Sequence, residues 1–260
     1  MKNKQTSRLL KNAHPLRCAA NRSAQRISIY ASRFSFLRAL HLNIFEQPSN
    51  AGFFRNHTVI IVFIVCLIMT AASYLFCDIP LAMYCRQISP SVINIFDVIT
   101  RLGISTWYIV ASIILYLFFR FIYKNDLNAS RSVFVFLSVS LSGIIIDVVK
   151  WIAGRYRPIE LFNHGHFGFE FFRNGYELTS FPSGHAQTAF ALATALTILF
   201  PRWGILLFVV AGTVGASRII LTSHYLSDVI AGAGIGILFT LAIKYYFDRK
   251  QIKLTKKIKI

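Results

Sequence analysis

FPSGH at residues 181–185 is the middle one of three polar stretches that interrupt an otherwise apolar chain; the others are KWIAGRYRP at 150–158 and SRIILTSHYLSD at 217–228. Around them lie apolar runs of roughly 20 residues, the length that a helix needs to cross a bilayer. We identify six such runs, at 57–76, 104–123, 133–151, 184–200, 203–222 and 227–247. The sequence therefore predicts an all-α, polytopic membrane protein built as a bundle of six transmembrane helices.

The composition favours the same class. Of the 260 residues, 55% are hydrophobic, and the mean hydropathy is +0.55. A soluble domain of this length would be far more polar. Between the spans we expect a loop at 77–103 with a short interfacial helix around Val92–Thr100, a polar turn at 124–132 and a long loop at 152–183.

The net charge of +18 is concentrated at the two ends of the chain. Residues 1–56 form a basic extension that we expect to be partly disordered, with a pattern at 24–45 that fits an amphipathic helix. Residues 57–247 form the membrane domain, and residues 248–260 form a basic tail. Such tails could bind nucleic acid, but in a membrane protein we expect them to contact anionic lipid instead.

Charge asymmetry also predicts the topology. Basic segments stay in the cytoplasm, which places both termini, the turn from Lys124 to Arg131 and Arg202 on that side. Six spans bring all these segments to one face and the polar stretches to the other. The expected location is the bacterial inner membrane, with the polar stretches facing the periplasm.

The residue types in the polar stretches suit phosphate binding. Arg157 and Arg218 offer planar, bidentate donors, and Lys150 adds a point charge. Ser183 and Gly184 precede a predicted helix, whose N-terminal amides favour an anion. Together these groups would stabilise the charge of a five-coordinate phosphorus transition state.

Three further residues suit attack on the bound phosphate. His224 and Asp228 are four positions apart at the predicted start of a helix, so the carboxylate is expected to orient the imidazole and leave one ring nitrogen free as a nucleophile. His185 is the expected general acid for the leaving oxygen and then the base for water. No metal or other cofactor is required, because the cations of the protein neutralise the phosphate.

These patterns, Lys-x6-Arg-Pro, Pro-Ser-Gly-His and Ser-Arg-x5-His-x3-Asp, resemble the type 2 phosphatidic acid phosphatase superfamily at every position. The family includes lipid phosphatases, undecaprenyl-diphosphate phosphatases, glucose-6-phosphatase and vanadium haloperoxidases. The resemblance implies a six-helix fold, a metal-independent lipid phosphatase and a phosphohistidine intermediate on His224. It assigns His185 as the acid and Lys150, Arg157, Ser183, Gly184 and Arg218 to the phosphate.

The substrate is less sharply indicated. The segment FDVITRLGISTWY at 96–108 is similar to one found in bacterial lipid A phosphatases of this superfamily, although it recurs in other branches. Lipid A is therefore the first expectation, and undecaprenyl diphosphate, phosphatidylglycerophosphate and phosphatidate are the alternatives. A lipid phosphotransferase would use the same residues, and a non-catalytic membrane protein would need none of them.

Several residues near the polar stretches stay open. Arg155 is expected to support the site or to contact a headgroup. His164 and His166 lie in the long loop, where histidines are usually incidental; a substrate contact is the alternative. Cys77 and Cys85 flank a short segment and are either a disulfide or two free thiols. Gly232, Gly234 and Gly236 indicate close helix packing.

Overall fold

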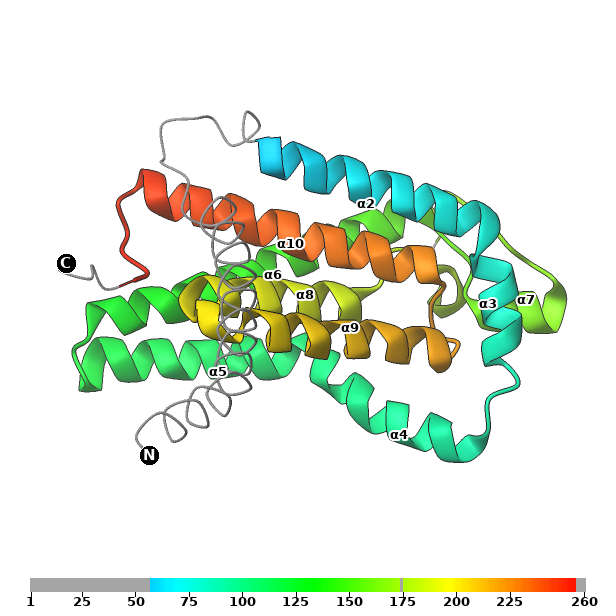
Figure 1. Ribbon diagram of the computed structural model, residues 1–260, viewed down its shortest axis with the longest axis horizontal. Coiled ribbons are helices and arrows are strands. Elements are labelled where there is room, and N and C mark those ends of the chain that lie inside the picture. The colour runs from blue at the N-terminus through cyan, green and yellow to red at the C-terminus, as the bar shows by residue number, and fades with distance from the viewer. Residues whose placement is uncertain (1–56, 174, 256–260) are drawn as a thin grey trace, which may run out of the picture. The chain divides into compact units, whose positions relative to one another are not determined.

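The computed structural model describes residues 57–173 and 175–255. The predicted basic extension at 1–56, with its amphipathic helix, and the end of the C-terminal tail lie outside the described residues. The described chain forms, in order, α2 (His57–Phe76), α3 (Asp78–Cys85), α4 (Pro90–Thr100), the 3₁₀ turn η2 (Arg101–Gly103), α5 (Ser105–Leu117), the π turn η3 (Phe118–Ile122), α6 (Asp126–Ala153), α7 (Pro158–His164), η4 (Tyr176–Leu178), α8 (Gly184–Leu199), η5 (Pro201–Trp203), α9 (Gly204–Ile220) and α10 (Leu226–Arg249) (Figure 1).

Helix α8 occupies the centre of this bundle and packs against α6, α9 and α10 (Figure 1). Its sequence is rich in small residues, and Ala186, Ala191 and Ala195 have no exposed surface. Small residues also line the facing side of α10. A Cβ atom on Gly236 would lie 2.5 Å from the carbonyl oxygen of Gln187, so the two backbones touch there. The predicted close packing of the glycines on this helix is confirmed.

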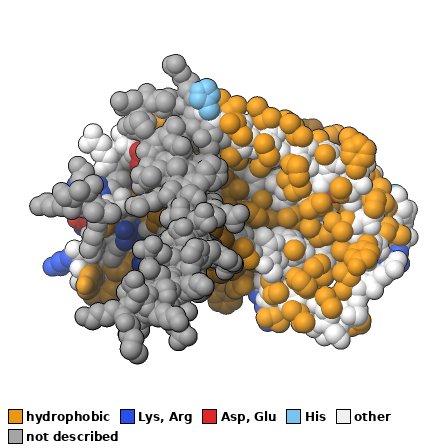
Figure 2. Space-filling model, in the orientation of Figure 1, with side chains coloured by type: hydrophobic (Ala, Val, Ile, Leu, Met, Phe, Trp, Pro, Cys, Tyr) orange, Lys and Arg blue, Asp and Glu red, His pale blue; other side chains and the backbone are white. Residues whose placement is uncertain are grey.

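The outer surface of the bundle is apolar. Figure 2 shows hydrophobic side chains over much of the visible face of the described residues. On α2, for example, Leu67 and Ile68 are about three-fifths exposed, which is the reverse of what a water-soluble helix would show. A lipid environment accounts for this exposure.

Five segments of the described chain are long and apolar enough to cross a membrane: Val59–Phe76, Pro90–Ile122, Asp126–Ala153, Pro201–Ile220 and Leu226–Arg249. The prediction of a helical, polytopic membrane protein is confirmed. The predicted span at 184–200 forms α8, but its 16 residues correspond to about 24 Å, less than the hydrocarbon thickness of about 30 Å. The count of six spans therefore stays a prediction.

Two parts of the expected layout were wrong. The polar turn at 124–132 is short, because α6 already begins at Asp126; the Asn125 side chain caps it by accepting a hydrogen bond from the amide of Asn128 at 3.0 Å. The loops at 77–103 and 152–183 are partly helical, since they contain α3 and α7. The helix predicted at Val92–Thr100 is present as α4, and its interfacial position stays a prediction, since α4 is also part of the apolar segment Pro90–Ile122.

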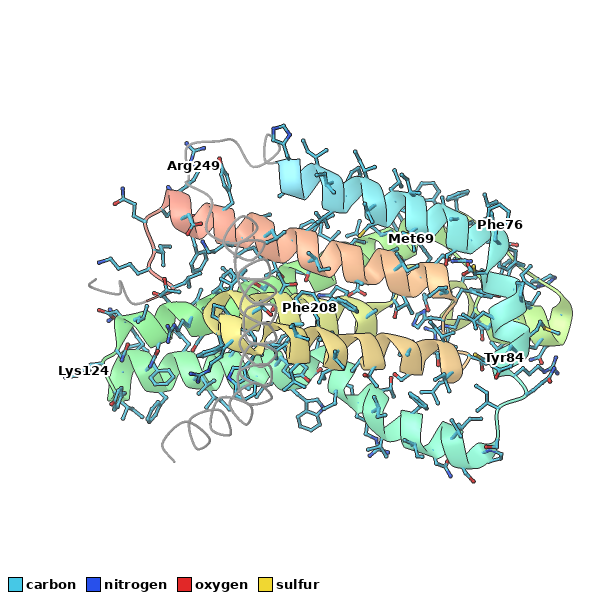
Figure 3. The ribbon with its side chains drawn as sticks, viewed as in Figure 1. Met69, Phe76, Tyr84, Lys124, Phe208 and Arg249 are labelled. Carbon is cyan, nitrogen blue, oxygen red and sulfur yellow. The ribbon has the colours of Figure 1, made fainter. Side chains whose placement is uncertain are left out.

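The two ends of the bundle differ in character. Lys124 and Arg249 lie at one end, whereas Phe76 and Tyr84 lie at the other (Figure 3). The latter end also carries α3 and α7 (Figure 1). At this end α6 stops at Gly154, whose left-handed backbone (φ 56°) turns the chain toward Arg155. A Cβ atom there would lie 1.9 Å from the carbonyl oxygen of Glu170, so this turn requires glycine.

Candidate active site

The three polar stretches meet in space, as the sequence predicted they would. The amide of Ser183 donates to the carbonyl oxygen of Asp228 at 3.0 Å, which joins the second stretch to the third. The guanidinium of Arg155 donates to Ser227 Oγ at 2.6 Å, which joins the first to the third. The stretches therefore form one cluster at the end of the bundle that carries α3 and α7.

Asp228 is fully buried, and its carboxylate accepts hydrogen bonds from several directions. The hydroxyl of Ser180 donates to it at 2.6 Å, and the amide of Tyr225 donates at 2.8 Å. Nη1 of Arg155 donates to the second oxygen. The carboxylate thus caps the first turn of α10 and holds the segment that precedes it.

The imidazole of His224 is oriented differently from the sequence expectation. Its Nδ1 atom lies 2.7 Å from the carbonyl oxygen of Ser180 and 3.7 Å from Oδ2 of Asp228. A carbonyl oxygen can only accept, so Nδ1 carries the proton and Nε2 keeps its lone pair. The Asp228 carboxylate therefore influences this ring in two ways. Its charge lies 3.7 Å from Nδ1, and it accepts a hydrogen bond from the hydroxyl of Ser180, the residue whose carbonyl oxygen faces the ring.

Burial determines the charge of the same imidazole. Desolvation lowers the pKa of His224 to about 4, although the neighbouring Asp228 carboxylate acts in the opposite direction. The ring is therefore neutral at physiological pH. A neutral ring whose Nδ1 proton is held by a carbonyl group presents Nε2 as a nucleophile.

His185 lies in the first turn of α8 and packs against the turn η2. A Cβ atom on Gly103 would lie 2.8 Å from Cβ and from Cδ2 of His185. Only a residue without a side chain leaves room for the imidazole in this position. Gly103 thus contributes to the site from outside the three polar stretches, within the segment at 96–108.

The three predicted phosphate-binding cations are brought together, and among the described residues no carboxylate forms an ion pair with any of them. Lys150, Arg157 and Arg218 repel one another electrostatically, and an anion between them would relieve this repulsion. Burial lowers the pKa of the Arg157 guanidinium from its ordinary value, but an arginine stays charged in proteins. The cluster is therefore a positive site suited to phosphate.

Each arginine is held by neutral groups. Arg157 donates from Nε to the carbonyl oxygen of Tyr176 at 2.9 Å, and its guanidinium lies 4.1 Å from the centre of the Tyr176 ring. Its Nη2 atom donates to Thr179 Oγ1 at 3.2 Å. Arg218 donates from Nη1 to Thr100 Oγ1 at 2.8 Å. These contacts fix the directions of both fork-shaped side chains.

Ser183 and Gly184 form the N-terminus of α8. Ser183 is the N-cap and has no exposed surface; its hydroxyl accepts from the amide of Ala186 at 3.5 Å. A Cβ atom on Gly184 would lie 3.6 Å from Nζ of Lys150. The ammonium group of Lys150 therefore stands beside the amides that begin this helix, where an anion is favoured.

Arg155 is more deeply involved than the sequence indicated. It has no exposed surface, and besides Ser227 and Asp228 it binds Oδ2 of Asp78, in α3, at 2.7 Å. The amide of Ser227 donates to the other oxygen of Asp78 at 3.0 Å. Asp78 was missed by sequence reasoning, because nothing in its neighbourhood indicates a partner that far along the chain.

Aromatic side chains surround this buried guanidinium. The centres of the Tyr225, Tyr74, Phe169 and Phe167 rings lie 4.6, 4.9, 5.2 and 5.5 Å from Cζ of Arg155. Burial raises the pKa of the Tyr225 phenol, so this ring stays neutral. The aromatic shell keeps water away from the ion pairs and strengthens them.

Fold and site together define an integral membrane protein whose helix ends hold a cluster of cationic side chains beside two imidazoles. The chain belongs to the PAP2 superfamily, whose family model matches residues 131–252. It is 32% identical over 199 residues to a lipid A 1-phosphatase of Rhizobium etli, covering 71% of this chain and 84% of the relative. A lipid A 1-phosphatase of Rhizobium johnstonii is 34% identical over 164 residues, which cover 59% of this chain and 67% of that protein.

A solved structure supports the fold. A transmembrane PAP2-type phosphatidylglycerolphosphate phosphatase from Bacillus subtilis matches with a TM-score of 0.51 over 76% of this chain and 98% of that one, at 20% sequence identity. At this identity the likeness concerns the arrangement of helices and carries no information on the substrate.

The cysteines do not form a disulfide among the described residues. Cys77 is exposed and Cys85 is buried, and both are free thiols, as is Cys66. Of the two possibilities left open by the sequence, the structure has the unpaired one.

Proposed function

We propose that this protein is a membrane lipid phosphatase that removes a phosphate group from lipid A, with the 1-phosphate as the first candidate. The observation that carries the proposal is the identity of 32% with a lipid A 1-phosphatase over most of both chains, supported by the predicted phosphate-binding and reacting residues that lie together at one end of the bundle. The segment at 96–108, which contacts the site through Thr100 and Gly103, favours the same substrate.

The proposed reaction begins at His224. Its Nε2 lone pair attacks phosphorus and forms an N–P bond, while the bond from phosphorus to the lipid oxygen breaks and that oxygen takes a proton from the imidazolium form of His185, which the negative charge of the bound phosphate favours. Water then attacks the phosphohistidine, His185 takes up a proton from this water, and the N–P bond breaks. Inorganic phosphate and the dephosphorylated lipid are the products.

The proposed roles of the other residues follow from charge and geometry. Lys150, Arg157 and Arg218 neutralise the phosphate, with Ser183 and Gly184 supplying the amides at the N-terminus of α8. Asp228 holds Ser180 and the first turn of α10, and thereby the carbonyl group that accepts the Nδ1 proton of His224. No step of this reaction uses a metal ion.

We further propose that the site faces the periplasm and that both termini are cytoplasmic. The cationic residues Lys124 and Arg249 lie at the end of the bundle opposite to Phe76 (Figure 3), and cationic ends stay in the cytoplasm. The site is at the Phe76 end, since Asp78 follows in the next helix. The basic tails would then meet anionic lipid on the inner leaflet.

A substrate panel tests this proposal. Purified protein in detergent is given lipid A, undecaprenyl diphosphate, phosphatidate or phosphatidylglycerophosphate, and inorganic phosphate is measured. The highest kcat/KM is expected for lipid A. A higher value for another lipid would make that lipid the proposed substrate in place of lipid A. Release of one phosphate from a single purified lipid separates hydrolysis from transfer to a second lipid.

Variants test the mechanism. His224→Ala and His185→Ala are each expected to lose nearly all phosphate release while the protein still inserts into the membrane. His57→Ala changes an exposed histidine at the start of α2 and is the matched control. Turnover at the wild-type rate in either site variant would refute the mechanism, whereas a wild-type protein that releases no phosphate from any of these lipids would favour a non-catalytic membrane protein.

A further inference from the structure

A cluster of metal-ligating side chains lies on the loop that follows Arg157, outside the groups used by the proposed reaction. Glu160, His164 and His166 each offer one ligand atom, and these three atoms lie within 4.8 Å of one another. We propose that this cluster binds a Zn²⁺ ion. The proposal goes beyond the proposed function, because the reaction above needs no metal.

The distances suit zinc. Oε2 of Glu160 lies 3.0 Å from Nδ1 of His164 and 3.8 Å from Nδ1 of His166. Ligand atoms about 2.0–2.1 Å from a tetrahedral zinc ion stand roughly 3.3 Å from each other. The two separations from Glu160 lie on either side of this value and the third is at most 4.8 Å, so side-chain rotations would close the three atoms around an ion.

The backbone builds this arrangement before any ion arrives. Glu160 and His164 are four residues apart on α7 and therefore share a face. The helix ends at Gly165, which has a left-handed backbone with a φ of 73°. This turn brings His166 back over the helix, where its amide donates to the carbonyl oxygen of Glu160 at 3.3 Å.

The donor set selects the kind of metal. Two imidazole nitrogens and one carboxylate oxygen suit Zn²⁺, whereas Mg²⁺ and Ca²⁺ prefer oxygen ligands. Three protein ligands leave a fourth position for water. Access is open, because both imidazoles are more than half exposed and a Cβ atom on Gly165 would meet nothing within 4 Å.

Bound zinc would join α7 to the segment that follows it. Arg157 is the N-cap of α7, and the residue after His166 is Phe167, whose ring stacks on Tyr74 at 5.2 Å. An ion held by Glu160, His164 and His166 would therefore fix the segment 158–167, which lies between Arg157 and the aromatic shell of Arg155. Its expected role is structural.

Direct zinc measurement tests the proposal. Full-length protein without a polyhistidine tag is treated with EDTA, desalted, incubated with ZnCl₂ and desalted again, and its zinc content is determined by mass spectrometry. The His164→Ala/His166→Ala double variant is expected to hold one zinc ion fewer per chain than the wild type. Glu160→Gln should bind at least about tenfold more weakly, and His57→Ala should equal the wild type.

Two further readouts keep the result unambiguous. Co²⁺ in place of zinc should give the visible absorption of a tetrahedral site in the wild type and lose it in the double variant. Zinc should raise the melting temperature of the wild type but not of the double variant. Equal zinc content in the two proteins, or no zinc in the wild type, would overturn the proposal; a matching gel-filtration profile shows that the variant is folded.

These measurements are independent of the lipid substrate. Removal of zinc with EDTA is expected to lower the melting temperature while catalytic turnover continues, since the proposed reaction uses no metal. Loss of all turnover on EDTA treatment, restored by zinc, would contradict the proposed function rather than the presence of the zinc site.

Discussion

Replacing Arg155 by methionine is the sharpest test of the buried network under the site. The guanidinium has no exposed surface and serves two carboxylates, Asp78 and Asp228. The three groups carry a formal charge of +1 − 2 = −1, and Arg155→Met changes it to −2 in a place that water does not reach. We expect the protein to insert into the membrane but to be markedly less stable.

The magnitude follows from the geometry. At an effective dielectric constant of about 20, the 2.7 Å contact between Arg155 and Asp78 gives a Coulomb energy of about 6 kcal/mol before desolvation is subtracted. Removing one partner from a buried ion pair typically costs about 3–5 kcal/mol. For a domain of this size, that lowers the melting temperature by roughly 6–20 °C.

Activity should fall as well. The loss should appear mainly in kcat, which depends on the position of His224, and less in KM, which depends on the phosphate-binding cations. Without Arg155, the Asp228 carboxylate loses a donor, and Ser180 and His224 shift with it. A displacement of about 1 Å costs about 100-fold in kcat. KM should change less, because Lys150, Arg157 and Arg218 remain. Phosphate release measured over a range of lipid concentrations gives both constants.

Charge balance provides the control. The double variant Arg155→Met/Asp78→Asn returns the formal charge of the network to −1 and should melt at a higher temperature than Arg155→Met alone. Arg155→Lys keeps the positive charge but loses the planar, fork-shaped donor group, so its melting temperature should lie between those of the wild type and Arg155→Met. Wild-type stability in Arg155→Met, or strictly additive losses in the double variant, would refute the reasoning.

Three other predictions follow from single contacts. Nitrogen-15 NMR of histidine-labelled protein should show His224 protonated at Nδ1 and neutral down to about pH 4, because burial disfavours the charged ring. His224→Asn serves to assign the signal, and a titration midpoint of His224 near pH 6.5 would contradict the prediction. Gly232→Ala should destabilise by about 1–3 kcal/mol in thermal unfolding, since its Cβ atom would lie 2.3 Å from the carbonyl oxygen of Ser183, whereas Gly212→Ala, with open space around it, should not. A reporter fused after Arg173 should be outside the cell membrane and one after Lys250 inside; the reverse pattern would reject the proposed orientation.

Helix boundaries were the part of the fold that the sequence predicted well. The run at 57–76 became α2 without change, and the starts of α8, α9 and α10 lie within one residue of the predicted spans. Apolar length and the flanking charges suffice for this. The start of α6 was missed because its first turns are polar, and polar residues that cap a helix resemble a loop in composition.

The site was predictable wherever residues at fixed spacing share one function, and not where contacts join distant segments. His224 and Asp228 illustrate the limit. Their spacing suggested a shared helical face, but α10 begins at Leu226, so the rule for helical neighbours does not reach His224. The Asp228 carboxylate caps the helix instead, and Ser180, 44 residues before His224, accepts the imidazole proton.

The position of the expected general acid depends on a segment outside the three polar stretches. Gly103 packs directly against the imidazole of His185. Thr100, three residues earlier, accepts a hydrogen bond from Arg218. Both belong to the end of α4 and the turn η2, where Val98 and Leu102 are at least half exposed on the apolar surface. One short segment therefore presents apolar side chains on the outer surface and contacts both Arg218 and His185. A change in this segment would therefore offer a physical means of holding the same reacting groups against a different lipid headgroup.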